Sequence, residues 1–90
     1  MKIFLSPQVS DRKINYQFEG ENIIATIDNI TDTFDFSTMP DGIMDEVETT
    51  LDVNPIVSAK RVEGELYVEL LNFIDDNATE EEKFPEWQEV

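Results

Sequence analysis

The sequence predicts a small, mainly β (α+β) protein: an antiparallel sheet or open barrel of five to seven strands, with one or two short helices. Three observations predict this class. Large apolar residues alternate with polar ones over several short stretches, turn-forming residues separate those stretches, and 90 residues are enough for one domain with one core. We expect a single domain over residues 1–90, with a loosely ordered acidic tail at 75–90.

The N-terminal half predicts short strands joined by tight turns. Residues 2–5 form an apolar run that Pro7 should end, because proline cannot donate a ladder hydrogen bond. Residues 14–18 alternate with a period of two, which is typical of a half-buried strand. Gly20 can take the positive φ of the following turn, and residues 23–28 form the returning strand.

A further turn at Asp28-Asn29 leads to a strand over residues 33–36, with Phe34 and Phe36 inward and Asp35 outward. Three strands linked this closely predict a meander.

Residues 43–53 are ambiguous between two structures. Ile43, Met44, Val47 and Leu51 stand at helical spacing. Thr49, Thr50 and Val53 favour an extended chain. We expect a short helix or an irregular segment here.

The clearest hairpin joins residues 56–62 to residues 65–73 across Glu63-Gly64. Both faces of its second strand are substantially apolar, which predicts a central position in the sheet. The expected core comprises Ile14, Tyr16, Phe18, Ile27, Phe34, Phe36, Leu66, Val68 and Leu70.

The C-terminal segment predicts one capped helical turn. Thr79 and Glu82 match a capping box, in which each side chain satisfies the backbone N–H of the other residue. The helix can run only to about Phe84, because Pro85 follows. Residues 87–90 are then free to form an edge strand.

The composition excludes several kinds of chemistry. The chain has 21 acidic and six basic residues, a net charge of −15, and no histidine or cysteine. It therefore lacks an imidazole base, a thiolate nucleophile and any thiolate zinc ligand. A polyanion is also repelled by nucleic acid and anionic lipid. We expect no enzymatic activity, no catalytic residues, no cofactor and no direct contact with nucleic acid or membrane.

One segment partly resembles a calcium loop. Asp75, Asn77 and Thr79 occupy the first, third and fifth positions, but Glu80 stands where the loop requires glycine. We therefore expect no metal site.

The candidate partner contacts are Phe84 and Trp87, the aromatic pair in an otherwise acidic tail. Trp87 has two alternatives: it folds back to seal the core, or it is an aromatic anchor for another protein.

Two stretches of the chain carry a resemblance to a known family. The first is Phe34-Asp35-Phe36-Ser37 followed by Pro40-Asp41-Gly42. The second runs over residues 61–71 and continues with Asn77-Ala78-Thr79-Glu80 and Phe84-Pro85. Together they resemble small uncharacterised proteins of tailed phages and prophages, encoded near tail-fibre and tail-assembly genes.

The resemblance implies an accessory or structural binding protein of a phage tail module, in the cytoplasm of the bacterial host or associated with the virion. Its expected partner is another protein, a tail or assembly protein. The alternative is an acidic decoy, a DNA mimic that inhibits a nucleic-acid-binding protein. A decoy needs carboxylates in ordered rows that recruit basic surfaces, whereas a tail accessory needs an apolar patch or an open strand edge.

Overall fold

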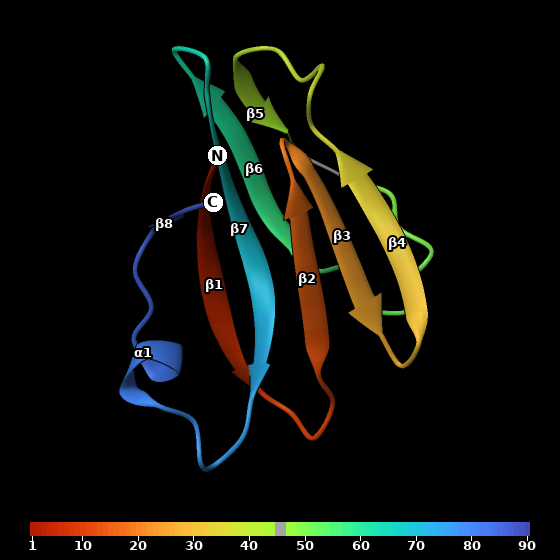
Figure 1. The fold of residues 1–90 in the computed structure, drawn as a ribbon, viewed down its shortest axis with the longest axis vertical. Coiled ribbons are helices and arrows are strands. Elements are labelled where there is room, and N and C mark those ends of the chain that lie inside the picture. Colours follow the sequence, from red (N-terminus) through yellow and green to blue (C-terminus); the bar gives the residue numbers. More distant parts are fainter. Residues whose placement is uncertain (45–46) are drawn as a thin grey trace.

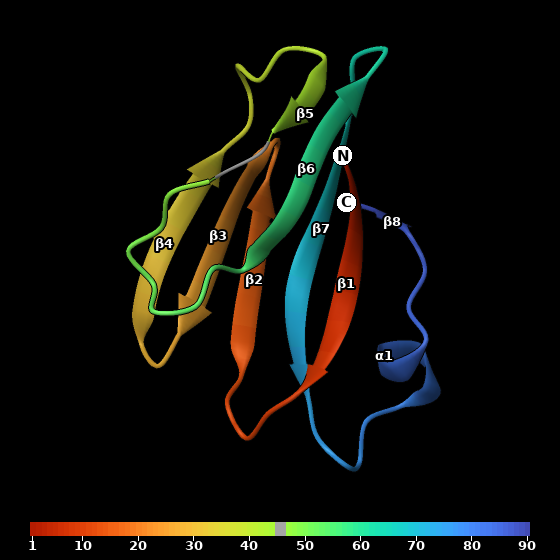
Figure 2. The same ribbon diagram turned by 180° about the vertical axis from the view of Figure 1, so that it is seen from behind.

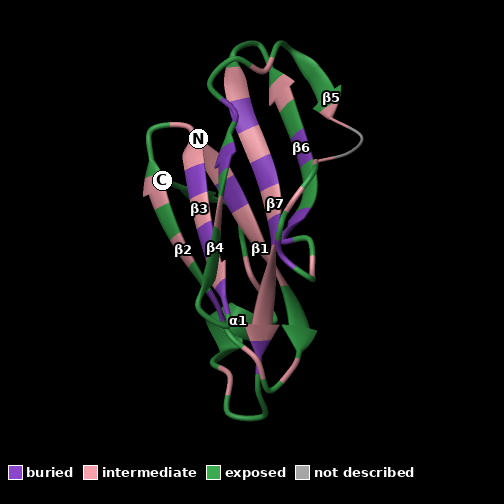
Figure 3. Cartoon of the chain, turned by 90° about the vertical axis from the view of Figure 1, so that its right-hand side faces the viewer, coloured by how far each residue is buried: buried purple, intermediate pink, exposed green. Residues whose placement is uncertain are grey.

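The fold consists of two β-sheets that face each other across one apolar core. It is described from a computed structural model, which covers residues 1–44 and 47–90. The five-stranded sheet has the order β5-β6-β7-β1-β8, and the three-stranded sheet has the order β2-β3-β4. The two groups of strands lie beside each other in Figure 1, and Figure 3 shows buried bands along strands of both sheets.

The strands and the helix follow one another along the chain as β1 (Lys2–Val9), β2 (Ile14–Glu19), β3 (Asn22–Ile27), β4 (Ile30–Asp35), β5 (Gly42–Met44), β6 (Ile56–Val62), β7 (Glu65–Ile74), α1 (Glu80–Lys83) and β8 (Gln88–Glu89). The predicted mainly β class is confirmed, with sheets that are not closed into a barrel. The described residues contain one strand more than expected because Gly42–Met44 form the short edge strand β5, whereas the two-residue β8 lies where an edge strand was expected.

Two tight turns confirm the predicted hairpins. Asp28 and Asn29 have φ of 51° and 66°, and Glu63 and Gly64 have φ of 49° and 83°. Two successive residues with positive φ define the turn whose twist matches that of the flanking strands. These turns fix the registers of the β3–β4 and β6–β7 pairs.

The predicted end of the first strand at Pro7 is wrong. β1 runs on to Val9 and pairs in parallel with β7, with Pro7 opposite Asn72. The described part of β8 pairs only with Lys2 and Ile3, so the other edge of β1 carries no paired strand at Pro7. A proline nitrogen that faces such an edge costs no ladder hydrogen bond.

The helical alternative for residues 43–53 is wrong for the described part of this stretch. Ile43 and Met44 belong to β5, residues 47–53 are irregular, and residues 45 and 46 lie outside the description. The carboxylate of Asp32 on β4 accepts hydrogen bonds from the Thr49 hydroxyl (2.8 Å) and the Thr50 N–H (2.9 Å). These bonds hold the segment in a non-helical path as it crosses the three-stranded sheet towards β6 (Figure 2).

The core is largely the predicted one. Seven of the nine expected residues are buried, whereas Tyr16 and Phe18 on β2 are only half-buried and pack against the core. The Tyr16 hydroxyl donates to the Leu71 carbonyl on β7, and burial raises the pKa of this phenol. The core also contains Ile3, Ile23, Ala25, Leu51, Ile56 and Ala59.

The two ends of the described chain meet beside β1. The Val90 N–H donates to the Met1 carbonyl at 2.9 Å, and α1 lies next to β1 (Figure 1). No helix in residues 1–44 and 47–90 combines the length and apolar character needed to cross a bilayer.

The burial of Val68 generates a test of the core. Val68 on β7 is 0% exposed, so Val68→Asp places an unpaired carboxylate between the sheets and should unfold the domain. The control is Thr33→Asp, at an exposed position of β4, which should melt cooperatively. Circular dichroism melts check both variants, and a soluble, cooperatively melting Val68→Asp protein would contradict the core assignment.

Candidate partner-contact site

The C-terminal segment that carries the predicted contact residues is held at both ends. Thr79 caps α1 through the predicted box: its hydroxyl accepts from the Glu82 N–H at 3.2 Å, and a Glu82 carboxylate oxygen accepts from the Thr79 N–H at 3.2 Å. Beyond the helix, Gln88 and Glu89 pair antiparallel with β1. The segment between these fixed points presents Phe84 and Trp87.

Phe84 and Trp87 line one shallow depression. Its volume is about 510 Å³, and its remaining walls come from Glu80, Glu81, Glu86 and Gln88. Phe84 is 74% exposed and Trp87 is 47% exposed. The depression therefore combines two aromatic rings with three carboxylates, which suits an apolar side chain accompanied by a basic group.

Trp87 also closes an aromatic cluster on the five-stranded sheet. Its ring lies 5.5 Å from that of Phe4 on β1 and 5.6 Å, edge to face, from that of Tyr67 on β7. Such pairs contribute about 0.5–1.5 kcal/mol beyond area burial. Trp87 thus packs on the outer face of the sheet rather than against the core between the sheets, while Phe84 extends into solvent.

Two lysines extend this cluster across the sheet. The ammonium of Lys2 lies 5.7 Å from the centre of the Tyr67 ring, and that of Lys60 lies 5.4 Å from it. Lysines on strands commonly serve solubility and protect sheet edges, but these two lie on inner strands of the sheet. Their convergence on one ring depends on the β6-β7-β1 order, which sequence reasoning missed.

Arg61 on β6 forms the main polar connection between the two sheets. Its two Nη atoms donate to the Glu21 carboxylate at 2.9 and 3.0 Å. Its remaining bonds go to backbone carbonyls: Nε to Met39 at 2.7 Å, Nη2 to Phe36 at 2.8 Å and Nη1 to Gly64 at 2.9 Å. A guanidinium has five N–H donors, and all five are used here.

This arrangement accounts for the titration of Glu21. The hydrogen bonds from Arg61 are the largest influence and hold the pKa of the Glu21 carboxyl below its ordinary value, against a smaller opposing effect of desolvation. The Arg61 side chain is 11% exposed, so the pair is only partly screened by solvent.

Arg12 makes a second, smaller connection. Its Nη2 donates to Asp28 at 2.7 Å and to Asp52 at 2.9 Å, which joins the β3–β4 turn to the segment before β6. The hydrogen bond from Arg12 lowers the pKa of Asp52. The Arg12 Nε is buried without a hydrogen-bond partner among the described atoms.

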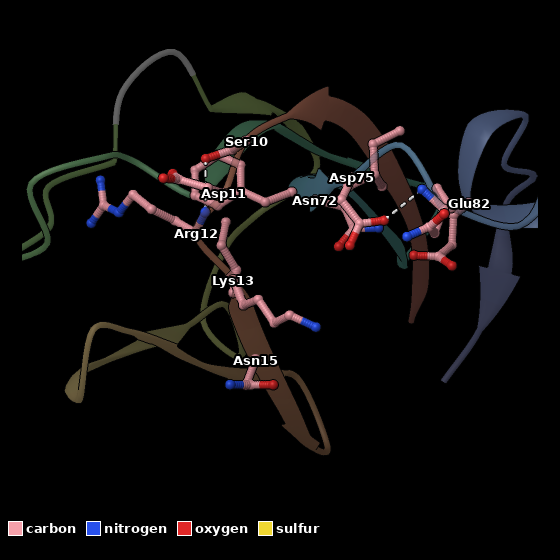
Figure 4. A pocket seen from close by; sticks show the side chains of 13 residues that line it. Ser10, Asp11, Arg12, Lys13, Asn15, Asn72, Asp75 and Glu82 are labelled. Atoms are coloured by element: carbon pink, nitrogen blue, oxygen red, sulfur yellow. Dashed lines mark hydrogen bonds between the residues drawn. The ribbon is translucent and has the colours of Figure 1, made fainter.

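An open polar cleft of about 430 Å³ lies between the β1–β2 loop and the β7–α1 loop. Lys13 extends into the space between these loops, whereas Arg12 turns away from it (Figure 4). Asp75 accepts from the Asn77 N–H at 2.8 Å, and Glu82 caps α1. Both carboxylates on that wall are therefore used in local structure, and none of the predicted contact residues lines the cleft.

The described residues offer no metal centre: no group of three or more histidine, cysteine, aspartate or glutamate side chains is placed to hold an ion. The chain matches no protein-family model, no curated protein and no solved structure.

The lowered pKa of Glu21 generates a test of the connection to Arg61. A carboxylate whose folded pKa is lowered stabilises the fold above its unfolded pKa of about 4.3, and this stabilisation is lost as the pH falls through the folded value. Glu21→Gln should therefore lower the melting temperature at pH 7, and its difference from the native protein should shrink steadily below about pH 4.

Glu19→Gln, at an exposed position of β2, is the matched control and should shift the melting temperature little at any pH. A Glu21→Gln difference that is absent at pH 7, or constant with pH, would show that the pair does not stabilise the fold.

Proposed function

We propose that the protein is an accessory or structural binding protein of a phage or prophage tail module, and that it contacts another protein through the depression lined by Phe84 and Trp87. The observation that carries the proposal is the exposure of Phe84. This ring is 74% exposed on a segment fixed by the α1 cap and the β8 pairing. Exposed aromatic side chains at fixed positions are the usual anchors of protein interfaces.

The energetics of the depression support a protein partner. Full burial of a phenylalanine side chain contributes about 1.5–3 kcal/mol, and little ordering is required of a segment that is already held in place. The carboxylates of Glu80, Glu81 and Glu86 surround the rings. We infer that the partner supplies an apolar side chain with lysine or arginine beside it.

The resemblance of residues 34–42 and 61–85 to small tailed-phage proteins supports the assignment to a tail module. The arrangement of the acids favours a binding protein over the acidic decoy. Asp28 pairs with Arg12, Asp32 accepts from Thr49 and Thr50, and Asp41 accepts from the Gly64 N–H at 3.1 Å. Carboxylates engaged in separate local contacts do not form the ordered rows that a DNA mimic requires.

Affinity capture from lysates of an induced lysogen tests the proposal. The native protein should capture a tail or assembly protein, and Phe84→Ala should reduce capture about tenfold, which corresponds to ~1.4 kcal/mol, with the melting temperature nearly unchanged. Val9→Ala is the matched control, because Val9 is equally exposed, at 73%, but lies elsewhere. Trp87→Ala should reduce both capture and stability, because it also loses the contacts with Phe4 and Tyr67.

Capture should persist at moderate salt, since apolar contact is not screened. Capture that is independent of Phe84 would contradict the proposed site, and displacement of the partner by DNA would favour the decoy.

A further inference from the structure

β8 is an edge strand whose outer side carries no further strand in the described part of the chain. It ends the five-stranded sheet, and its two residues pair only with Lys2 and Ile3 of β1. β8 lies at the outer margin of the molecule, with β1 on its other side (Figure 1). An edge strand presents backbone N–H and C=O groups that can pair with another chain.

The direction of these backbone groups follows from one hydrogen bond. The Val90 N–H donates to the Met1 carbonyl at 2.9 Å, so the backbone groups of Val90 point towards β1. Successive residues of an antiparallel strand direct their backbone groups to opposite sides. Those of Gln88 therefore also point towards β1, and those of Glu89 point away from it. The Glu89 N–H and C=O are thus placed to bond an added strand.

The depression lined by Phe84 and Trp87 lies along this same edge. Trp87 packs on the outer face of the sheet. Gln88 is paired with Ile3, a buried residue, so its side chain is directed to the inner face. Both Trp87 and Gln88 line the depression. A depression bordered by neighbours that point to opposite faces follows the edge of the strand.

Two other strand edges carry features that oppose such pairing. On β4, the Asp32 carboxylate accepts from the Thr33 N–H at 2.9 Å and from the Thr50 N–H at 2.9 Å, so the crossing segment is tied to this edge. On β1, Pro7 lacks the N–H that an added strand would need. The edge of β8 is bordered by carboxylates instead.

The charge of this edge selects the kind of strand that it accepts. Glu80, Glu81 and Glu86 border the depression, and none of them is in an ion pair with another described residue. Glu89 lies 3.5 Å from the Met1 amino group. A second copy of this chain, or another acidic strand, is repelled here, whereas a strand that carries lysine or arginine is attracted.

We propose that β8 accepts a strand of the partner protein, which extends the five-stranded sheet and lies along the depression. This strand addition rests on the proposed function, because it uses the same depression and gives the partner an extended segment. Apolar side chains of that segment pack beside Trp87, and lysine or arginine side chains alternate with them beside the carboxylates. Main-chain hydrogen bonds to Glu89 supply affinity, and the alternating side chains supply specificity.

Peptide titrations test the added strand directly. A short capped peptide in which lysine alternates with valine and phenylalanine should bind and change the fluorescence of Trp87, the single tryptophan of the chain. Binding should slow hydrogen exchange at the Glu89 amide, whereas the Gln88 and Val90 amides, which point towards β1, should change little. The same peptide with glutamate in place of lysine should not bind.

Two N-methylated forms of the peptide separate strand addition from simple apolar contact. In an added strand the N–H groups of alternate residues face β8. Methylation of either the lysine amides or the apolar amides should therefore weaken binding at least about tenfold, and methylation of the other set should have little effect. Equal binding of the two forms, or unchanged exchange at Glu89, would overturn the proposal.

A matched pair of variants tests the edge from the protein side. Glu89→Pro removes the outward N–H, whereas Glu89→Gln removes the same charge and keeps it. Both should melt close to the native protein in circular dichroism, because proline is tolerated where its nitrogen faces away from the sheet. Glu89→Pro should bind the alternating peptide at least about tenfold more weakly than Glu89→Gln. Equal affinities of two folded variants would contradict strand addition.

Capture from lysogen lysates distinguishes this proposal from the proposed function. A partner that is lost with Phe84→Ala and with Glu89→Pro, but kept by Glu89→Gln, supports both. A partner that is lost with Phe84→Ala and kept equally by the two Glu89 variants supports the contact site and overturns strand addition. A native protein that captures no partner, but protects Glu89 when the alternating peptide binds, would overturn the proposed function and support the strand-binding edge.

Discussion

The structure depends on one arginine that is placed on the inward face of a strand. Arg61 occupies β6 opposite Leu66 and Gly42, at the end of the space between the sheets, where its five donors are matched by one carboxylate and three carbonyls. Those acceptors belong to the β2–β3 turn, the chain after β4 and the β6–β7 turn. A single side chain therefore fixes three separate parts of the chain. Lysine offers a compact point charge with three donors and cannot reproduce this geometry.

The distribution of charged residues over the molecule is consistent with this role of Arg61. With six basic residues against 21 acidic ones, most carboxylates have no cation available. The two arginines are used internally, joining the sheets at Glu21 and joining Asp28 to Asp52. Lys2 and Lys60 are concentrated on one outer face around Tyr67. The remaining carboxylates are spread over the rest of the surface, including Glu65 and Glu69 beside Tyr67, where they repel other polyanions. The surface thus combines a tyrosine flanked by two lysines on the five-stranded sheet with an aromatic depression bordered by glutamates.

The parts of the fold that could be predicted from the sequence are those set by neighbouring residues. The turns at Asp28-Asn29 and Glu63-Gly64, the alternation along β2 and β7, and the cap of α1 by Thr79 all arise from local chemistry, and the structure confirms them. The parallel pairing of β1 with β7 could not be predicted, because it joins residues more than 60 positions apart. It also explains the error at Pro7, whose tolerance depends on which strand lies beside it. The irregular path of residues 47–53 follows from the bonds that Asp32 makes with Thr49 and Thr50, which no periodicity reveals.

The candidate site also has one part that the sequence predicts and another part that depends on the fold. Phe84 and Trp87 were predicted from composition alone, as aromatic residues in an acidic tail, and the structure brings them to one depression. The contacts of Trp87 with Phe4 and Tyr67, and the roles of Arg61 and Lys60, could not be predicted from the sequence because they depend on strand order.

Hydrogen exchange on an Arg61→Lys protein tests most directly the claim that Arg61 holds the two sheets together, with Arg12→Lys as control. Amide protection should fall in residues 21–23, 36–39 and 61–64, where the acceptors of Arg61 lie, and the melting temperature should fall more than in the control. Unchanged protection in those segments, with a native melting temperature, would contradict the claim that Arg61 holds the two sheets together.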